Sequence, residues 1–122
     1  MKPTRHAPPR HLESLSLLMA DLPVVRKSGL TLGDCLIVRT RNSSYRIVSL
    51  GDGRFRVSGG WFDRTGASPA TLTINGCTWG GTAIHADVAA APGLFLEFGN
   101  RVLTTRIQEF RLIPAADTDR VH

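Results

Sequence analysis

Apolar and polar residues alternate with a period of two along much of this chain. Successive side chains of a β-strand point to opposite faces, so this alternation predicts strands. The clearest example is residues 54–58, where Phe55 and Val57 are expected to point inward and Arg54 and Arg56 outward. The segment therefore predicts a strand with one buried face and one basic face.

Similar short runs recur along the sequence and are separated by turn-forming residues. The triplet Gly51-Asp52-Gly53 predicts a tight turn, because glycine adopts positive φ without steric cost. Asn75-Gly76 is the preferred pair for a type I′ turn and predicts a hairpin. Residues 87–93 are expected to form a loop or a single helical turn. The predicted strands are residues 35–38, 45–50, 54–58, 71–74, 77–79, 83–86, 94–98, 101–105 and 107–113.

Many short strands at close spacing, together with twelve glycines, indicate an all-β fold. The prediction is a small antiparallel barrel or a sandwich. Closure into a barrel is favoured because it removes unpaired strand edges. We expect one domain over residues 11–113, followed by a frayed tail over residues 114–122.

The N-terminal region has a different pattern. Residues 1–10 combine three prolines with three basic residues and predict a flexible basic arm. Residues 11–22 predict the one amphipathic helix of the chain, which Pro23 ends. Its apolar stripe packs either across the open end of the barrel or in an oligomer interface. The stripe consists of Leu12, Leu15, Leu18, Met19 and Leu22.

Positive charge is concentrated in the first half of the chain. Lysine and arginine total 15 against 10 acidic residues, and residues 1–64 hold eleven of the basic residues. Arginine suits phosphate because its planar guanidinium donates two parallel hydrogen bonds. The alternative interpretation is a solvated face without a ligand. The arginines on adjacent predicted strands are Arg39, Arg41, Arg46, Arg54 and Arg56.

Two functions follow from these features. The preferred prediction is a non-enzymatic interaction module that assembles into a homo-oligomer, since closed symmetric oligomers are common. The alternative is binding of single-stranded RNA or DNA through the arginine-rich strands, with Tyr45, Trp61 and Trp79 as stacking residues. The interface residues expected for the oligomer are Leu15, Leu18, Leu22, Trp61 and Phe62.

No catalytic constellation, metal-ligand spacing or cofactor motif is visible in the sequence. His85 and Asp87 would share a face of a strand, and the expected role is an ordinary polar pair. Cys35 is expected to be buried and inert, and Cys77, after the predicted turn, less buried. No apolar run approaches the roughly 18 residues of a membrane span, and the N-terminus lacks the apolar core of a signal peptide. We therefore expect no membrane association and a cytoplasmic location.

Four short motifs resemble a family of short uncharacterised bacterial proteins. They are Thr40-Arg41-Asn42-Ser43 with Tyr45, Val57 with Gly59-Gly60 and Phe62, Thr73 with Gly76 and Gly80-Gly81, and Thr104-Thr105. The resemblance covers residues 33–113, about two-thirds of the chain. It implies a β-rich fold and carries no activity.

Overall fold

The computed structural model describes residues 23–81 and 83–116 of the chain. The expected basic arm over residues 1–10 and the expected helix over residues 11–22 lie outside the described residues. The same is true of residues 117–122 in the expected tail. At residue 115 the chain is still held to the domain, because the backbone N–H of Ala115 donates a hydrogen bond to Asp34 Oδ1 at 2.9 Å.

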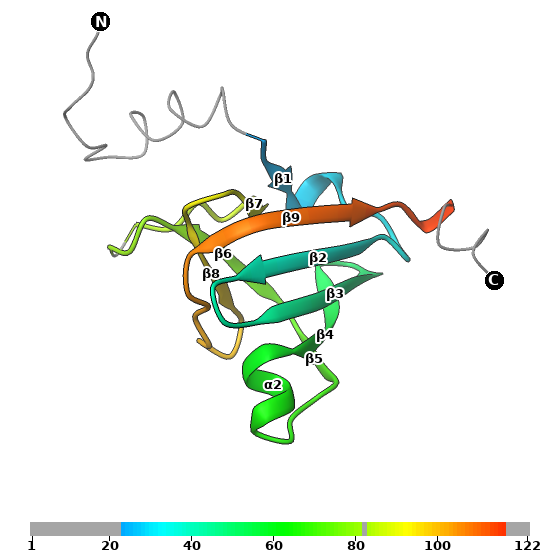
Figure 1. The fold of residues 1–122 in the computed structure, drawn as a ribbon. Helices are drawn as coiled ribbons and strands as arrows, with labels where there is room; N and C mark the ends of the chain where they lie inside the picture. The colour runs from blue at the N-terminus through cyan, green and yellow to red at the C-terminus, as the bar shows by residue number, and fades with distance from the viewer. Residues whose placement is uncertain (1–22, 82, 117–122) are drawn as a thin grey trace, which may run out of the picture.

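The described chain is mostly antiparallel β-strand, as the alternation predicts, and its largest element is a five-stranded sheet (Figure 1). Four of its strands contain the segments predicted at residues 35–38, 45–50, 54–58 and 107–113. The spatial order is β5 (Ala70–Leu72), β4 (Arg54–Gly59), β3 (Ser44–Gly51), β2 (Cys35–Thr40) and β9 (Ile107–Ile113).

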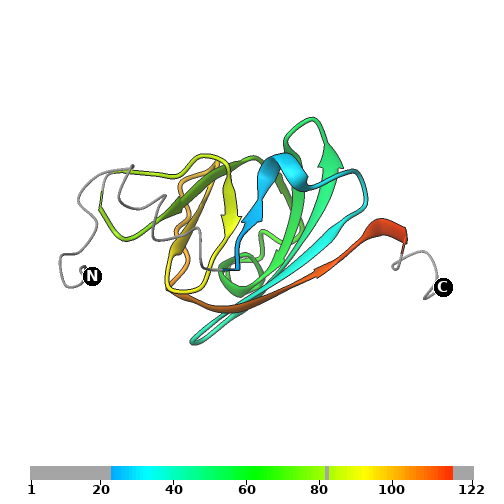
Figure 2. The ribbon, with the colours of Figure 1, turned by 90° about the horizontal axis from the view of Figure 1, so that it is seen from above.

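Two smaller antiparallel pairs lie against the inner face of this sheet (Figure 2). One pairs β1 (Val25–Arg26) with β7 (Val88–Ala90), and the other pairs β6 (Ile74–Thr78) with β8 (Phe95–Phe98). A 3₁₀ turn, η1 (Lys27–Gly29), follows β1.

A short helix, α2 (Gly60–Arg64), follows β4 and contributes Phe62 to the core. The core lies between the large sheet and the two pairs. Its largest fully buried side chains include Phe62, Phe98, Leu36, Ile47, Leu94 and Leu96.

The preferred closed barrel is not found among the described strands, which form three separate hydrogen-bonded sheets. Closure would require the edge strand β5 to continue the ladder around to β9. Instead the chain leaves the large sheet after β5, and the following strand β6 pairs with β8. The all-β prediction is therefore confirmed. The two edge strands of the five-stranded sheet, β5 and β9, do not pair with each other.

The predicted hairpin at Asn75-Gly76 is wrong, because both residues lie inside β6. The ladder with β8 shifts register between Ile74 and Gly76, as at a β-bulge. Gly76 has φ +136°, and a Cβ placed there would collide with the backbone carbonyl of His85. Gly76 thus allows two segments of the chain to lie close together, and the Asn-Gly pair does not form the predicted turn.

The loop predicted over residues 87–93 is also wrong in part, since it contains strand β7. Val88, Ala89 and Ala90 are all buried, so the strand is covered on both faces. A strand buried on both sides has no apolar–polar alternation, and this explains why the pattern gave no strand signal. Within the described ranges no helix is long and apolar enough to cross a membrane.

Candidate nucleic-acid interface

The outer face of the five-stranded sheet is the face turned away from the core. Alternation along β4 places Phe55 and Val57 in the core and leaves Arg54 and Arg56 exposed on this outer face. The inward and outward directions predicted for these four residues are confirmed. The hydrophobic requirement of the inner face therefore fixes the direction of the arginines on the outer face.

Strand register brings further arginines to the same face, because directly opposed residues in an antiparallel pair share a face. Ile37 of β2 lies opposite Arg46 on one side and opposite Arg111 of β9 on the other. Arg39 lies one pleat further along β2, opposite Glu109. We call this set the arginine face: Arg39, Arg46, Arg54, Arg56 and Arg111.

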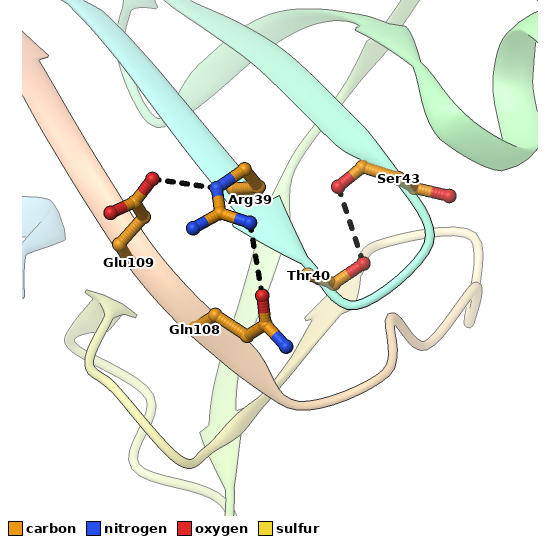
Figure 3. Close-up of polar contacts among 5 residues, drawn as sticks. All are labelled: Arg39, Thr40, Ser43, Gln108 and Glu109. Atoms are coloured by element: carbon orange, nitrogen blue, oxygen red, sulfur yellow. Dashed lines mark hydrogen bonds and ion pairs between the residues drawn. The ribbon is translucent and has the colours of Figure 1, made fainter.

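Arg39 is the one member of the arginine face that makes an ion pair within the described chain (Figure 3). Its Nε donates to Glu109 Oε2 at 2.6 Å, and its second nitrogen, Nη1, donates to Gln108 Oε1 at 3.0 Å. The hydrogen bond and the charge of Arg39 lower the pKa of Glu109, and those of Glu109 raise the pKa of Arg39. Both side chains are largely exposed, so the pair contributes little to folding stability.

The other four arginines have no carboxylate partner in the part of the chain that the structure describes. Arg46, Arg54, Arg56 and Arg111 are exposed, and among the described strand residues Glu109 is the one carboxylate that shares their face. The half-buried apolar side chains of Ile37 and Val48 lie in the rows between them. Four guanidinium groups are thus available to an external anion.

The structure differs from the sequence prediction at Arg41, which lies outside the arginine face, and at Arg111, which belongs to it. Arg41 was expected beside the other four, but it lies in the bend between β2 and β3 and outside the strand rows. The sequence prediction does not include Arg111 in the arginine face, although it does predict the strand that contains Arg111. The missing information was that β9 pairs with β2, a contact between segments far apart in the sequence.

The aromatic residues expected to stack on bases do not lie on the arginine face. Tyr45 is buried on the inner face, and Trp79 is half-buried on the far side of the core. Trp61 is on α2, beyond the end of β4, and is 37% exposed. The described rows of the arginine face therefore contain apolar and hydroxyl side chains between the arginines, and no aromatic ring.

The residues expected at an oligomer interface are also separated. Leu15, Leu18 and Leu22 lie outside the described residues. Phe62 is fully buried in the core and packs edge-to-face against Phe98, with ring centroids 5.2 Å apart, so it is a core residue instead.

Trp61 borders a hollow of about 450 Å³. Its indole packs edge-to-face on Phe62, with ring centroids 5.2 Å apart, and its backbone N–H donates to Tyr45 Oη at 3.4 Å. The other residues that line the hollow are Asn42, Ser43, Tyr45, Arg64, Leu103 and Thr105.

His85 has no carboxylate partner among the described residues. Asp87 accepts hydrogen bonds from the backbone and hydroxyl of Ser28, at 2.9 and 2.8 Å, and these bonds lower its pKa. Burial and the charge of Arg26 lower the pKa of His85. Asp87 therefore holds the segment after β1, and the expected pair with His85 is not made.

Both cysteines are buried thiols. Burial raises the pKa of Cys77 to about 12, and it raises the pKa of Cys35 despite the opposing effect of Arg46. The expectation that Cys77 is the less buried of the two is wrong, because its exposure is 0%. Within residues 23–81 and 83–116, no group of three or more His, Cys, Asp or Glu side chains is arranged to hold a metal ion.

Comparison with protein-family models, with curated proteins and with solved structures gives no match for this chain. The resemblance to short bacterial proteins therefore remains an expectation.

Proposed function

We propose that this protein is a non-enzymatic module that binds the phosphate backbone of nucleic acid through the arginine face. The observation that carries the proposal is the gathering of five exposed arginines on one sheet face, where the described strands place a single carboxylate. Guanidinium groups bind phosphate oxygens through charge-assisted hydrogen bonds and release condensed counterions. A broad, exposed face also suits an extended polyanion better than a small enclosed ligand.

The absence of aromatic rings from the described rows refines this proposal. Base stacking distinguishes single strands from duplexes, and it needs exposed rings beside the basic groups. Ile37, Val48 and Ser58 lie between the arginines instead. We therefore expect binding that depends weakly on base sequence and that does not select single strands through stacking.

The test is a titration of the full chain into a fluorescently labelled oligonucleotide, as a single strand and as its duplex, at several salt concentrations. Arg54→Glu combined with Arg56→Glu should abolish binding and leave the fold intact, because both side chains are exposed. For duplex DNA, log K falls with log salt by about 0.9 per neutralised phosphate. The four unpaired arginines should therefore give a slope of about −3 to −4.

A matched control separates the arginine face from net charge alone. Arg64→Glu with Arg101→Glu removes the same charge from positions outside the arginine face, and it should change binding little. Equal losses in both double variants would mean that net charge alone attracts nucleic acid. Unchanged binding by Arg54→Glu with Arg56→Glu would contradict the proposal directly.

We also propose self-assembly, in which the buried Phe62 takes no part. A different surface, the open edge of the large sheet, supports it better.

A further inference from the structure

Strand β9 forms an edge of the five-stranded sheet. It pairs with β2 on one side, and no described strand pairs with its other side. Within the described residues, Ile107 at the start of β9 is the only residue bonded on that side, to the backbone of Gly93 and Leu94. From residue 108 to residue 113 the outer edge of β9 has no backbone partner in the described chain.

The direction of the backbone groups along this edge follows from the neighbouring strand. Thr40 of β2 donates its backbone N–H to Ser43, toward β3, at 2.8 Å. Backbone groups alternate in direction along a strand, so Arg39 bonds toward β9, where it pairs with Glu109. The next residue, Phe110, and every second residue after it therefore direct N–H and C=O groups to the open side.

The open edge also carries apolar surface. Leu112 is 40% exposed and Phe110 is half-buried, and both lie on the inner side of the sheet, opposite Leu36 and Val38 of β2. Unpaired edges with apolar side chains favour pairing with another chain, and proteins usually protect them with lysine, proline or a bulge. Here the outer side of the edge carries one acidic and one basic residue, Glu109 and Arg111.

We propose that β9 pairs antiparallel with β9 of a second copy of this chain, around a two-fold axis beside Phe110. In this register Phe110 lies opposite Phe110 of the partner subunit, and their backbone groups exchange hydrogen bonds. Glu109 then lies opposite Arg111 of the partner subunit, and symmetry repeats the pair. The strand is thus complementary in charge to its own copy.

Neighbouring registers lack this complementarity. A shift that places the axis beside Arg111 brings two arginines opposite each other, which is destabilising across a strand pair. An axis beside Leu112 places Pro114 opposite Phe110, and proline has no N–H to donate. The charges and the proline together favour the register centred on Phe110.

This inference goes beyond the proposed function, because the pairing needs no nucleic acid. Opposed residues of an antiparallel pair share a face, so the two arginine faces would lie on the same side of one continuous sheet. The dimer would present a basic surface twice as long as that of one subunit.

The test is sedimentation analysis of the full chain across a range of protein concentrations, without nucleic acid. Glu109→Arg and Arg111→Glu should each weaken the dimer by roughly ten-fold or more, since each creates two repulsive pairs. The double variant with both substitutions exchanges the charges and should return the dissociation constant to within about three-fold of the parent. Arg54→Glu, a charge reversal on β4, should leave it unchanged.

A backbone variant tests the same edge without changing its charge. Leu112→Pro removes an N–H that points to the open side, a position where edge strands tolerate proline. It should leave the protein monomeric, whereas Leu112→Ala retains the N–H and should still dimerise, more weakly. If Leu112→Pro fails to fold, the charge exchange still decides the question.

Three results would overturn the proposal. One is a parent protein that stays monomeric at the highest concentration reached. Another is a charge exchange that fails to restore the dimer. The third is a monomer whose Phe110 and Leu112 amides are protected from hydrogen exchange, because another segment of the chain would then cover the edge. None of these results bears on whether the arginine face binds nucleic acid.

Discussion

Arg46 and Arg111 lie on either side of Ile37, in one row across three strands of the large sheet. Arg46 comes from the second strand of a local hairpin, and Arg111 comes from the last strand of the described chain. Neither makes an ion pair within the described chain. Their shared row joins basic residues from both halves of the sequence into one surface.

Arg46→Ala and Arg56→Ala should each weaken nucleic-acid binding, and each loss should be about the same for all base sequences. Each should also reduce the magnitude of the salt slope by about 1, the value for one phosphate contact. Arg39→Ala should change the slope much less, because Glu109 already balances its charge. The measurement is fluorescence anisotropy across a salt series. Equal slopes for all three variants would contradict the assignment of separate roles.

Phe62→Ala should lower the free energy of unfolding by about 3–5 kcal/mol, because it leaves a cavity among fully buried rings. Trp61→Ala at the neighbouring position should cost only about 1–2 kcal/mol, since part of the indole is already exposed. Urea unfolding followed by circular dichroism measures both. If Phe62→Ala altered the oligomer mass and left stability unchanged, Phe62 would be an interface residue after all.

The buried thiol of Cys77 predicts a loss of stability at alkaline pH. Burial raises its pKa from an ordinary value of about 9 to about 12, so folding favours the neutral thiol. Its contribution is complete below about pH 9 and is lost as the pH rises toward 12. The slope in that window should be about 1.4 kcal/mol per pH unit.

The measurement compares the free energy of unfolding of the parent and Cys77→Ala between pH 8 and the alkaline limit of the parent fold. The difference between them should diminish as the pH rises, because alanine does not titrate. A difference that stays constant with pH would show that the thiol is not protected by burial. Native Cys77 should also resist thiol reagents near pH 8 and react after denaturation.

Gly76→Ala should destabilise the fold by about 2–4 kcal/mol, because the added Cβ meets the His85 carbonyl and the backbone has φ +136°. Gly53→Ala is the matched control, since its φ is +74° and open space surrounds it. It should cost about 1 kcal/mol, the cost of a left-handed backbone alone. Equal losses, measured by thermal or urea unfolding, would mean that the close approach at His85 is not limiting.

Local pattern was sufficient for strands that have one buried face. Along β4 the apolar residues occupy every second position, so the alternation predicts both the strand and the outward direction of Arg54 and Arg56. Pattern was insufficient for β7, where both faces are buried, and for Gly76, where an Asn-Gly pair lies within a strand. In both places the deciding contact comes from another segment.

The candidate site also has one part that follows from local sequence pattern and another part that depends on contacts between distant segments. Charge and alternation in the sequence alone determine that arginines from neighbouring strands share an exposed face, because the hydrophobic effect fixes the opposite face. Only the tertiary structure decides that β9 joins β2, that Arg111 completes the face, and that β9 has an open edge. Strand pairing across long sequence separations depends on how the whole core packs, and no local period encodes that choice.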